Sequence, residues 1–220
     1  MALTLAGCDG PLSTLAPSGP AAAAIATLWW VMLAGATALF ALVMILFALT
    51  MRRGGWGAAI SPARWLVLGG LVLPAMILTP LVAYALIMGQ RLLPLPGTAR
   101  QRIEAEGRQW SWTFRYPGEG GVTTVDVLHL PAGVPVDIAV SSVDVIHSFW
   151  VPRFAGKIDA VPGHVNVLRI QADEPGRYEG HCSEFCGVGH TRMGFTVIVH
   201  PAKDFPAELA KAAASSKVKQ

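Results

Sequence analysis

The N-terminal part of the chain contains two long stretches without charge. No charged side chain lies between Asp9 and Arg52, and a second uncharged run extends from Trp65 to Gln90. A helix needs about 20 apolar residues to cross a bilayer. The alternative, a buried core helix, would be shorter and would alternate with a polar face, so both runs favour membrane spans.

These lengths predict a transmembrane helical hairpin over residues 24–92, with spans at about 24–51 and 65–90. The loop between the spans carries Arg52 and Arg53. Cytoplasmic loops are enriched in Lys and Arg. We therefore expect this loop in the cytoplasm and both ends of the chain on the opposite side of the membrane.

After the hairpin, apolar positions alternate with a period of two, as in strands that are half buried in a sheet. Four such segments are separated by turns rich in Pro and Gly: 122–129, 134–140, 164–170 and 194–199. Short strands at this spacing predict an all-β sandwich or barrel, which we place at 98–201. Residues 202–220 are rich in Ala, Lys and Ser and are expected to form a frayed helix or a loose C-terminal tail.

Composition and charge narrow the class of protein. Hydrophobic residues make up 53% of the chain and charged residues only 14%, against about 25% charged in average soluble proteins. These values exclude a wholly soluble globule and a disordered chain. Residues 101–200 carry eleven acidic and eight basic side chains. An acidic folded part excludes a nucleic-acid binder and suits a basic partner.

The extracytoplasmic N-terminal segment, residues 1–23, contains a lipobox-like motif, Leu5-Ala6-Gly7-Cys8. In bacterial lipoproteins the Cys of such a motif becomes the lipidated first residue after cleavage. The stretch before Cys8 is shorter than a signal peptide and has no basic residue. Either the true start lies upstream and Cys8 is lipidated, or Cys8 is an ordinary thiol near a membrane.

The reactive side chains gather in residues 180–193. This segment holds Cys182, Cys186, His190 and Met193 between glycines that allow tight turns. A disulfide between the cysteines would leave the His and the Met unexplained. A tetrahedral zinc site has little use for a thioether, and a mononuclear blue-copper site uses one thiolate rather than two.

A binuclear copper centre is the fourth interpretation, and it uses every group. Two thiolates would bridge two copper ions, each capped by one imidazole and completed by weak axial ligands. The second imidazole must then come from another strand, and His147, in the apolar run Val145–Trp150, is the natural donor. A lone His on an apolar strand is usually a packed core residue, but here the cluster lacks one such group.

At this point the chain resembles subunit II of the haem–copper terminal oxidases of the cytochrome c oxidase type. Its residues 182–193 fit the family's copper motif C-S-E-x-C-G-x-x-H-x-x-M completely. Three further stretches resemble family motifs in the same order: Gln109-Trp110-Ser-Trp112, Asp144-Val-Ile-His147-Ser-Phe149 and Lys157-Ile-Asp159-Ala-Val-Pro162-Gly163. The resemblance covers nearly the whole chain and implies a cupredoxin-like Greek-key β-sandwich or barrel anchored by the hairpin.

The resemblance also implies roles for single residues. Cys182 and Cys186 would bridge the two copper ions of the centre known as CuA, and His147 and His190 would each cap one ion. Met193 would be a weak ligand of one ion.

Two further roles follow from the resemblance. Glu184 would serve the second copper ion through its backbone carbonyl, and its side chain would bind a magnesium ion at the interface with the catalytic subunit. Trp110 corresponds to the aromatic residue through which electrons arrive, although Trp110 and Trp112 also fit an interfacial aromatic belt.

The implied function is that of subunit II of a respiratory cytochrome c oxidase in the bacterial inner membrane. CuA would accept electrons from cytochrome c and pass them to the haem–copper subunit I, where oxygen is reduced to water and protons are pumped. The expected partners are subunit I, other oxidase subunits, cytochrome c and the membrane. Both termini and the copper domain would be periplasmic. Five acidic residues are candidates for steering a basic cytochrome c: Asp144, Asp159, Asp173, Glu174 and Glu179.

Two positions depart from the family pattern. Val67 stands where a Glu near a proton-uptake route is frequent, which puts proton uptake through this subunit in doubt. His181 stands where a Gln is frequent; it is expected either to tune the site from outside the ligand set or to be a tolerated polar residue.

Two other functions compete with this assignment. A quinol oxidase subunit II would be a structural partner without copper; the lipobox-like start favours it, whereas the complete ligand set opposes it. A membrane-anchored copper-delivery protein would need open, exchangeable ligation and would hold one copper ion per chain.

Overall fold

The computed structural model describes residues 8–52, 57, 60–92 and 101–217. Within them the chain forms two compact units. One runs from Thr27 to Leu92, and the other joins the N-terminal residues up to Ala26 with everything from Leu93 onward.

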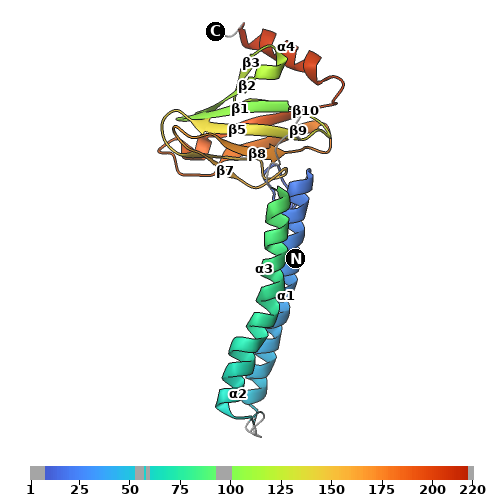
Figure 1. Cartoon of the computed structure of the whole chain (residues 1–220), viewed down its shortest axis with the longest axis vertical. Coiled ribbons are helices and arrows are strands. Elements are labelled where there is room, and N and C mark those ends of the chain that lie inside the picture. The colour runs from blue at the N-terminus through green and yellow to red at the C-terminus, as the bar shows by residue number, and fades with distance from the viewer. Residues whose placement is uncertain (1–7, 53–56, 58–59, 93–100, 218–220) are drawn as a thin grey trace, which may run out of the picture. The chain divides into compact units, whose positions relative to one another are not determined.

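The unit from Thr27 to Leu92 is helical (Figure 1). Its first helix, α1 (Pro20–Thr50), has a mean hydropathy of 2.5, and the second span, from Pro62 to Gln90, has a mean hydropathy of 2.3. Both are long and apolar enough to cross a membrane.

The second span is made of three consecutive elements: α2 (Pro62–Val67), the π-helical turn η1 (Leu68–Val72) and α3 (Leu73–Leu92). Pro74 has no N–H to donate to the carbonyl four residues earlier, and the π turn lies directly before it. Pro80 lies inside α3.

The other unit is a sandwich of two five-stranded sheets. The first sheet has the order β3-β2-β1-β5-β8, made of β1 (Gln101–Arg108), β2 (Ser111–Tyr116), β3 (Val122–Val125), β5 (Val136–Ser142) and β8 (Asn166–Ile170). The second has the order β4-β10-β9-β6-β7, made of β4 (Val127–Pro131), β6 (His147–Trp150), β7 (Ile158–Ala160), β9 (Gly176–Cys182) and β10 (Gly194–His200). Strand pairs β1/β5 and β4/β10 are parallel and the other pairs are antiparallel.

Aromatic rings fill the space between the sheets. Trp112, Phe114, Phe149 and Phe195 are buried and contact one another at centroid distances of 5.1–6.4 Å. In β2 and β10 the buried residues alternate with less buried ones, because successive side chains of a strand point to opposite faces. In β6, His147, Ser148 and Phe149 are all buried. The expected β-sandwich is therefore present, and its core lies directly beneath His147 and Cys182.

The segment 122–129, expected as one strand, is divided in the structure. Asp126 has a left-handed backbone (φ 54°) and separates β3 from β4, which belong to different sheets. Its carboxylate accepts a hydrogen bond from the Trp112 N–H at 2.7 Å, and an Asp tolerates this conformation better than most residues. The alternating pattern alone could not show the break, since residues on both sides of it remain β-branched.

The C-terminal segment, expected as a frayed helix or a loose tail, is a docked helix. Residues Phe205–Lys217 form α4, which lies beside β3 and β4 (Figure 1). Phe205 and Leu209, one turn apart, are 2% and 1% exposed in the core of the sandwich. This spacing places both side chains on one face of the helix, so α4 belongs to the folded domain and not to a tail.

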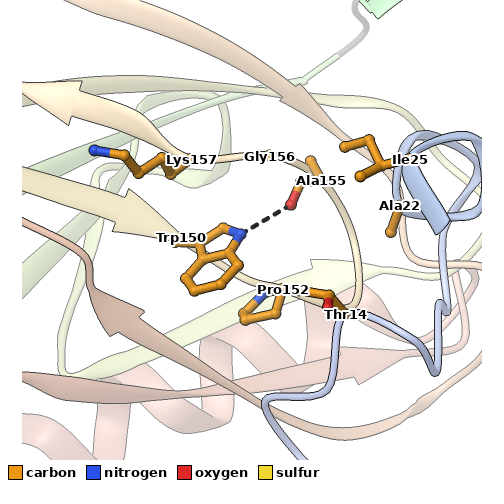
Figure 2. A pocket seen from close by; sticks show the side chains of 8 residues that line it. All are labelled: Thr14, Ala22, Ile25, Trp150, Pro152, Ala155, Gly156 and Lys157. Atoms are coloured by element: carbon orange, nitrogen blue, oxygen red, sulfur yellow. Dashed lines mark hydrogen bonds between the residues drawn. The ribbon is translucent and has the colours of Figure 1, made fainter. Parts of the chain in front are cut away.

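The N-terminal segment packs on the sandwich as well. The Arg153 side chain donates to the Ala16 carbonyl at 2.7 Å, and the Ser18 N–H donates to the Arg153 carbonyl at 2.7 Å. Beside this segment, the loop after β6 lines a half-open apolar pocket of about 190 Å³ (Figure 2). Ile25 and Trp150 face it, and the Trp150 indole donates to the Ala155 carbonyl at 3.2 Å.

A pair of histidines, His129 buried and His200 partly buried, predicts how the stability of the domain depends on pH. His129 Nδ1 and His200 Nε2 are 2.8 Å apart. Burial and the neighbouring His200 lower the pKa of His129 to about 4. Between about pH 6.5 and 4, His129 is therefore protonated in the unfolded chain but neutral in the folded one. The free energy of unfolding decreases as the pH falls through this range.

We expect the free energy of unfolding to decrease by about 1–3 kcal/mol through this window, and His129→Phe to remove that part of the slope. Denaturant unfolding at a series of pH values measures both. Parallel pH profiles for the wild type and the variant would contradict the prediction.

Candidate metal centre

The sheet register brings the distant imidazole to the cysteines. Strands β6 and β9 are neighbours, and Phe149 pairs with Cys182, so His147 lies beside the loop that follows β9. This loop returns through the short helix η3 (His190–Arg192) into β10. The Cys182 N–H donates to the Met193 carbonyl at 2.9 Å and closes the loop at its base.

The side chains of the loop and of His147 form one compact cluster. Cys182 Sγ and Cys186 Sγ are 3.8 Å apart. Cys182 Sγ lies 3.9 Å from His147 Nδ1 and 3.3 Å from the Glu184 carbonyl oxygen. Cys186 Sγ lies 3.7 Å from His190 Nδ1 and 3.7 Å from Met193 Sδ. Each thiol therefore has one imidazole and one further weak donor beside it.

Each imidazole lies beside a different thiol, His147 beside Cys182 and His190 beside Cys186. The ligand atoms of His147, Cys182 and Cys186 all lie within 4.8 Å of one another, and His190 is not part of that set. His147, Cys182 and Cys186 are therefore close enough together to hold a metal ion.

The two thiols can bind a metal ion, but only in their ionised form. Their Sγ atoms are much farther apart than the about 2.05 Å of a disulfide, and both cysteines are free and buried. Burial and the neighbouring Cys182 raise the pKa of Cys186 well above its ordinary value. Ionised thiolates in this place need a metal charge to offset them, so the donor set fits soft ions such as copper.

Polar side chains outside the ligand set hold the cluster. Asp144 Oδ1 accepts a hydrogen bond from His147 Nε2 at 2.8 Å, and Asp144 Oδ2 accepts one from the Gln109 N–H at 2.8 Å. Gln109 Nε2 and Trp110 Nε1 both donate to the Cys186 carbonyl, at 2.8 and 3.1 Å. The sequence singled out Gln109 within a motif, and Asp144 within a motif and as a steering charge; their contacts depend on residues that are far apart along the chain.

Trp110 lies at the surface beside the cysteine loop, with 42% of its area exposed. A Cβ placed on Gly189 would overlap Trp110 ring atoms Cγ and Cδ2. Gly187 has a left-handed backbone (φ 110°) and also lies against the indole. Glycine at these positions lets the indole reach the loop. Two loops that hydrogen-bond to the Gln109–Trp110 turn carry further exposed apolar side chains: Val143, Val145, Ile146, Phe185 and Val188.

The Glu184 side chain, expected to bind magnesium, lies next to Lys157. Lys157 Nζ is 3.4 Å from Glu184 Oε2 and 3.2 Å from Asp159 Oδ1. The carboxylates of Glu184 and Asp159 therefore both pair with the exposed ammonium group of Lys157. The magnesium role of Glu184 stays a prediction.

The remaining singled-out residues lie outside the cluster. The His181 ring lies 6.0 Å from the His190 ring, centroid to centroid; its role stays a prediction. Val67 is the last residue of α2. Cys8 is exposed, whereas the rest of the lipobox-like motif lies outside the described residues.

Comparison with known proteins shows which proteins this chain is similar to. Residues 122–200 match the family described as cytochrome c oxidase subunit II, periplasmic domain. The chain is 32% identical to cytochrome c oxidase subunit 2 of Alkalihalophilus pseudofirmus over 94% of this chain and 64% of the relative. It is 30% identical to ubiquinol oxidase subunit 2 of Acetobacter aceti over 98% of this chain and 74% of the relative. The chain spans only 31–64% of the length of three cytochrome c oxidase relatives.

A solved structure agrees with the fold. The periplasmic domain of subunit II of the Bradyrhizobium japonicum cytochrome oxidase superposes with a TM-score of 0.52 at 29% identity, covering 55% of this chain and 99% of that domain. The expected cupredoxin-like domain with two apolar N-terminal helices is thus confirmed, and the chain is membrane-anchored. The chain belongs to the subunit II family of haem–copper oxidases, the family of cytochrome c oxidase subunit II, which also includes quinol oxidase subunits.

Proposed function

We propose that this protein is the electron-accepting subunit II of a respiratory cytochrome c oxidase and carries a binuclear CuA centre. It would take electrons from cytochrome c on the periplasmic side of a bacterial inner membrane. It would deliver them to the haem–copper subunit I, where oxygen is reduced to water. Other oxidase subunits would complete the complex.

One observation carries the proposal: the two thiols are flanked by different imidazoles. His147 lies at Cys182 and His190 lies at Cys186, with the Glu184 carbonyl and Met193 on opposite sides. Two copper ions held by these six groups would supply a one-electron acceptor whose unpaired electron is shared over both metals.

Other features of the protein would hold the ligands in place, connect them to the surface and attract the electron donor. His147, Cys182 and Cys186 are at most 3% exposed, and His190 is partly buried. His147 and Cys182 lie on paired strands of one sheet, which would keep their positions fixed when the charge of the centre changes. Trp110 connects the solvent to the Cys186 carbonyl through its indole N–H. The acidic domain and its apolar rim around Trp110 would attract and seat a basic cytochrome c.

Low-temperature EPR of the full, copper-loaded and oxidised chain tests the proposal. Two equivalent copper nuclei that share one electron give a seven-line hyperfine pattern, and metal analysis should give two copper ions per chain. A four-line pattern, a silent spectrum or a zinc content of one per chain would refute the CuA centre. A single exchangeable copper ion would support the copper-delivery function instead.

A quinol oxidase subunit is the second candidate, because relatives of that name match most of this chain. The Bacillus cereus quinol oxidase subunit 2 is 32% identical over 89% of this chain and 71% of the relative. The complete copper ligand set opposes this candidate. Oxidation of cytochrome c by the assembled oxidase, measured against oxidation of a quinol, separates the two.

The packing of Trp110 on Gly189 gives a prediction about electron arrival. In Gly189→Ala the new Cβ would overlap the indole and displace it. We expect reduction of the centre by cytochrome c to slow at least about tenfold, a barrier change of about 1.4 kcal/mol, while the EPR pattern persists. Stopped-flow absorbance measures the rate.

Gly118→Ala is the matched control, because a Cβ there meets nothing within 4 Å. Equal rates for Gly189→Ala and Gly118→Ala would show that the position of Trp110 does not control electron arrival.

A further inference from the structure

One carboxylate is shared by two parts of the metal centre that come from distant positions in the chain. Asp144 Oδ1 accepts from His147 Nε2 at 2.8 Å and from the Val145 N–H at 2.7 Å. Asp144 Oδ2 accepts from the Gln109 N–H at 2.8 Å. Gln109 lies between β1 and β2 and directly precedes Trp110. Asp144 therefore holds a metal ligand with one oxygen and the turn that carries Trp110 with the other.

The first contact fixes the proton on His147. An ionised carboxylate only accepts hydrogen bonds, so Nε2 of His147 carries the proton and Nδ1, which faces Cys182 Sγ, keeps its lone pair for a metal. Hydrogen bonds from Gln109, His147 and Val145 all favour the ionised form of this carboxylate. The carboxylate is charged at neutral pH.

The second contact extends to the other side of the cluster. The backbone N–H of Gln109 donates a hydrogen bond to Asp144, which fixes the position of Gln109. The side-chain amide of Gln109 and the indole N–H of Trp110 each donate a hydrogen bond to the Cys186 carbonyl. A shift of Asp144 would therefore move the His147 ring and the Gln109–Trp110 turn together. A steering charge free in solvent would have no such partners, whereas the side chain of Asp144 is only 28% exposed.

We propose that Asp144 is a positioning residue that couples His147 to the Gln109–Trp110 turn, and so sets both the reduction potential of the copper centre and the rate at which electrons reach it through Trp110. The inference rests on the proposed CuA function. Under this proposal one side chain, Asp144, controls both the reduction potential and the rate of electron arrival. This role is separate from any part that Asp144 has in attracting cytochrome c.

The first test is Asp144→Asn in the full, copper-loaded chain. An amide has no negative charge and cannot accept hydrogen bonds on its nitrogen, so one of the two contacts is lost. Removing a negative charge beside the centre favours the reduced state. We expect the equilibrium constant for one-electron reduction to rise at least about tenfold, which is about 59 mV for one electron, in a spectroelectrochemical titration.

Glu174→Gln is the matched control, because it removes the same charge from an exposed side chain of the same domain. Exposed charges interact weakly through water, so we expect its reduction equilibrium to change less than about twofold. Equal shifts for Asp144→Asn and Glu174→Gln would overturn the positioning role.

The second test is Asp144→Glu, which keeps the charge but moves the carboxylate by one methylene. We expect its reduction by a photogenerated neutral deazaflavin radical to slow at least about tenfold, as expected when the reacting groups lose their fixed geometry. A neutral reductant is insensitive to docking charges. If Asp144 only attracts cytochrome c, Asp144→Glu will match the wild type, and Asp144→Asn will slow only the cytochrome c reaction, an effect that high salt removes. That result would overturn the proposal.

Failure of the proposed function gives a different result. A wild-type chain without the seven-line pattern would refute CuA itself. A wild type with that pattern and two unaltered Asp144 variants would refute the role of Asp144 alone. Should Asp144→Asn fail to hold copper, Asp144→Glu carries the test, because it preserves the charge that pairs with His147.

Discussion

Cys186→Ser is expected to abolish the binuclear centre. Cys186 Sγ contacts His190 Nδ1 and Met193 Sδ, both at 3.7 Å, and lies 3.8 Å from Cys182 Sγ. A serine hydroxyl is a hard, weakly acidic donor and does not replace a thiolate for copper. Without it His190 and Met193 have no thiolate partner. Copper content should fall from two ions per chain to one or none, the seven-line EPR pattern should disappear, and reduction by cytochrome c should fall at least about 100-fold.

Cys8→Ser is the matched control for this variant. Cys8 is exposed in the N-terminal segment, whereas Cys186 is buried in the sandwich. The Cys8 variant should keep both copper ions and the wild-type spectrum. Retention of two copper ions by Cys186→Ser would contradict the bridging role of this thiol.

Phe149→Ala is expected to cause the largest loss of stability. Its ring is fully buried, 5.1 Å from the Phe195 ring and 5.7 Å from the Trp112 ring between centroids, and it pairs with Cys182 across β6 and β9. Removal of a buried ring from a packed core costs about 3–5 kcal/mol. Denaturant unfolding of the full chain in detergent, followed by near-UV circular dichroism, measures the change.

Phe185→Ala makes the same truncation at a position where the ring is 76% exposed. Surface substitutions of this kind usually change stability by less than about 0.5 kcal/mol. If both variants lose similar stability, the aromatic cluster between the sheets is not the main support of the domain.

The membrane anchor and the loop ligands could be predicted from the sequence because their signals are local. An uncharged run that is long enough to cross a bilayer is visible in the chain itself, and α1 shows it with a mean hydropathy of 2.5. Cys182, Cys186, His190 and Met193 lie within twelve residues, so their chemistry could be assessed before any fold was known. The need for one more imidazole then pointed to His147.

The division of the strands could not be predicted in the same way. The segment 122–129 has β-branched residues on both sides of Asp126, yet the left-handed backbone at Asp126 sends β3 and β4 to different sheets. The Asp126 conformation is fixed by a hydrogen bond to Trp112, which belongs to another strand. Similarly, α4 docks because Phe205 and Leu209 meet a core that only the assembled sandwich provides.

The sequence by itself determined which groups are available: two apolar spans, an acidic β domain, and two thiols with a histidine and a methionine in one loop. The tertiary structure decided how these groups meet. The register of β6 on β9 brings His147 to Cys182, and the turn between β1 and β2 brings Gln109 and Trp110 to Cys186. The physical reason is that residue type and spacing are properties of a short stretch of chain, whereas hydrogen bonds such as those of Asp144 join positions that become neighbours only when the sheets pair.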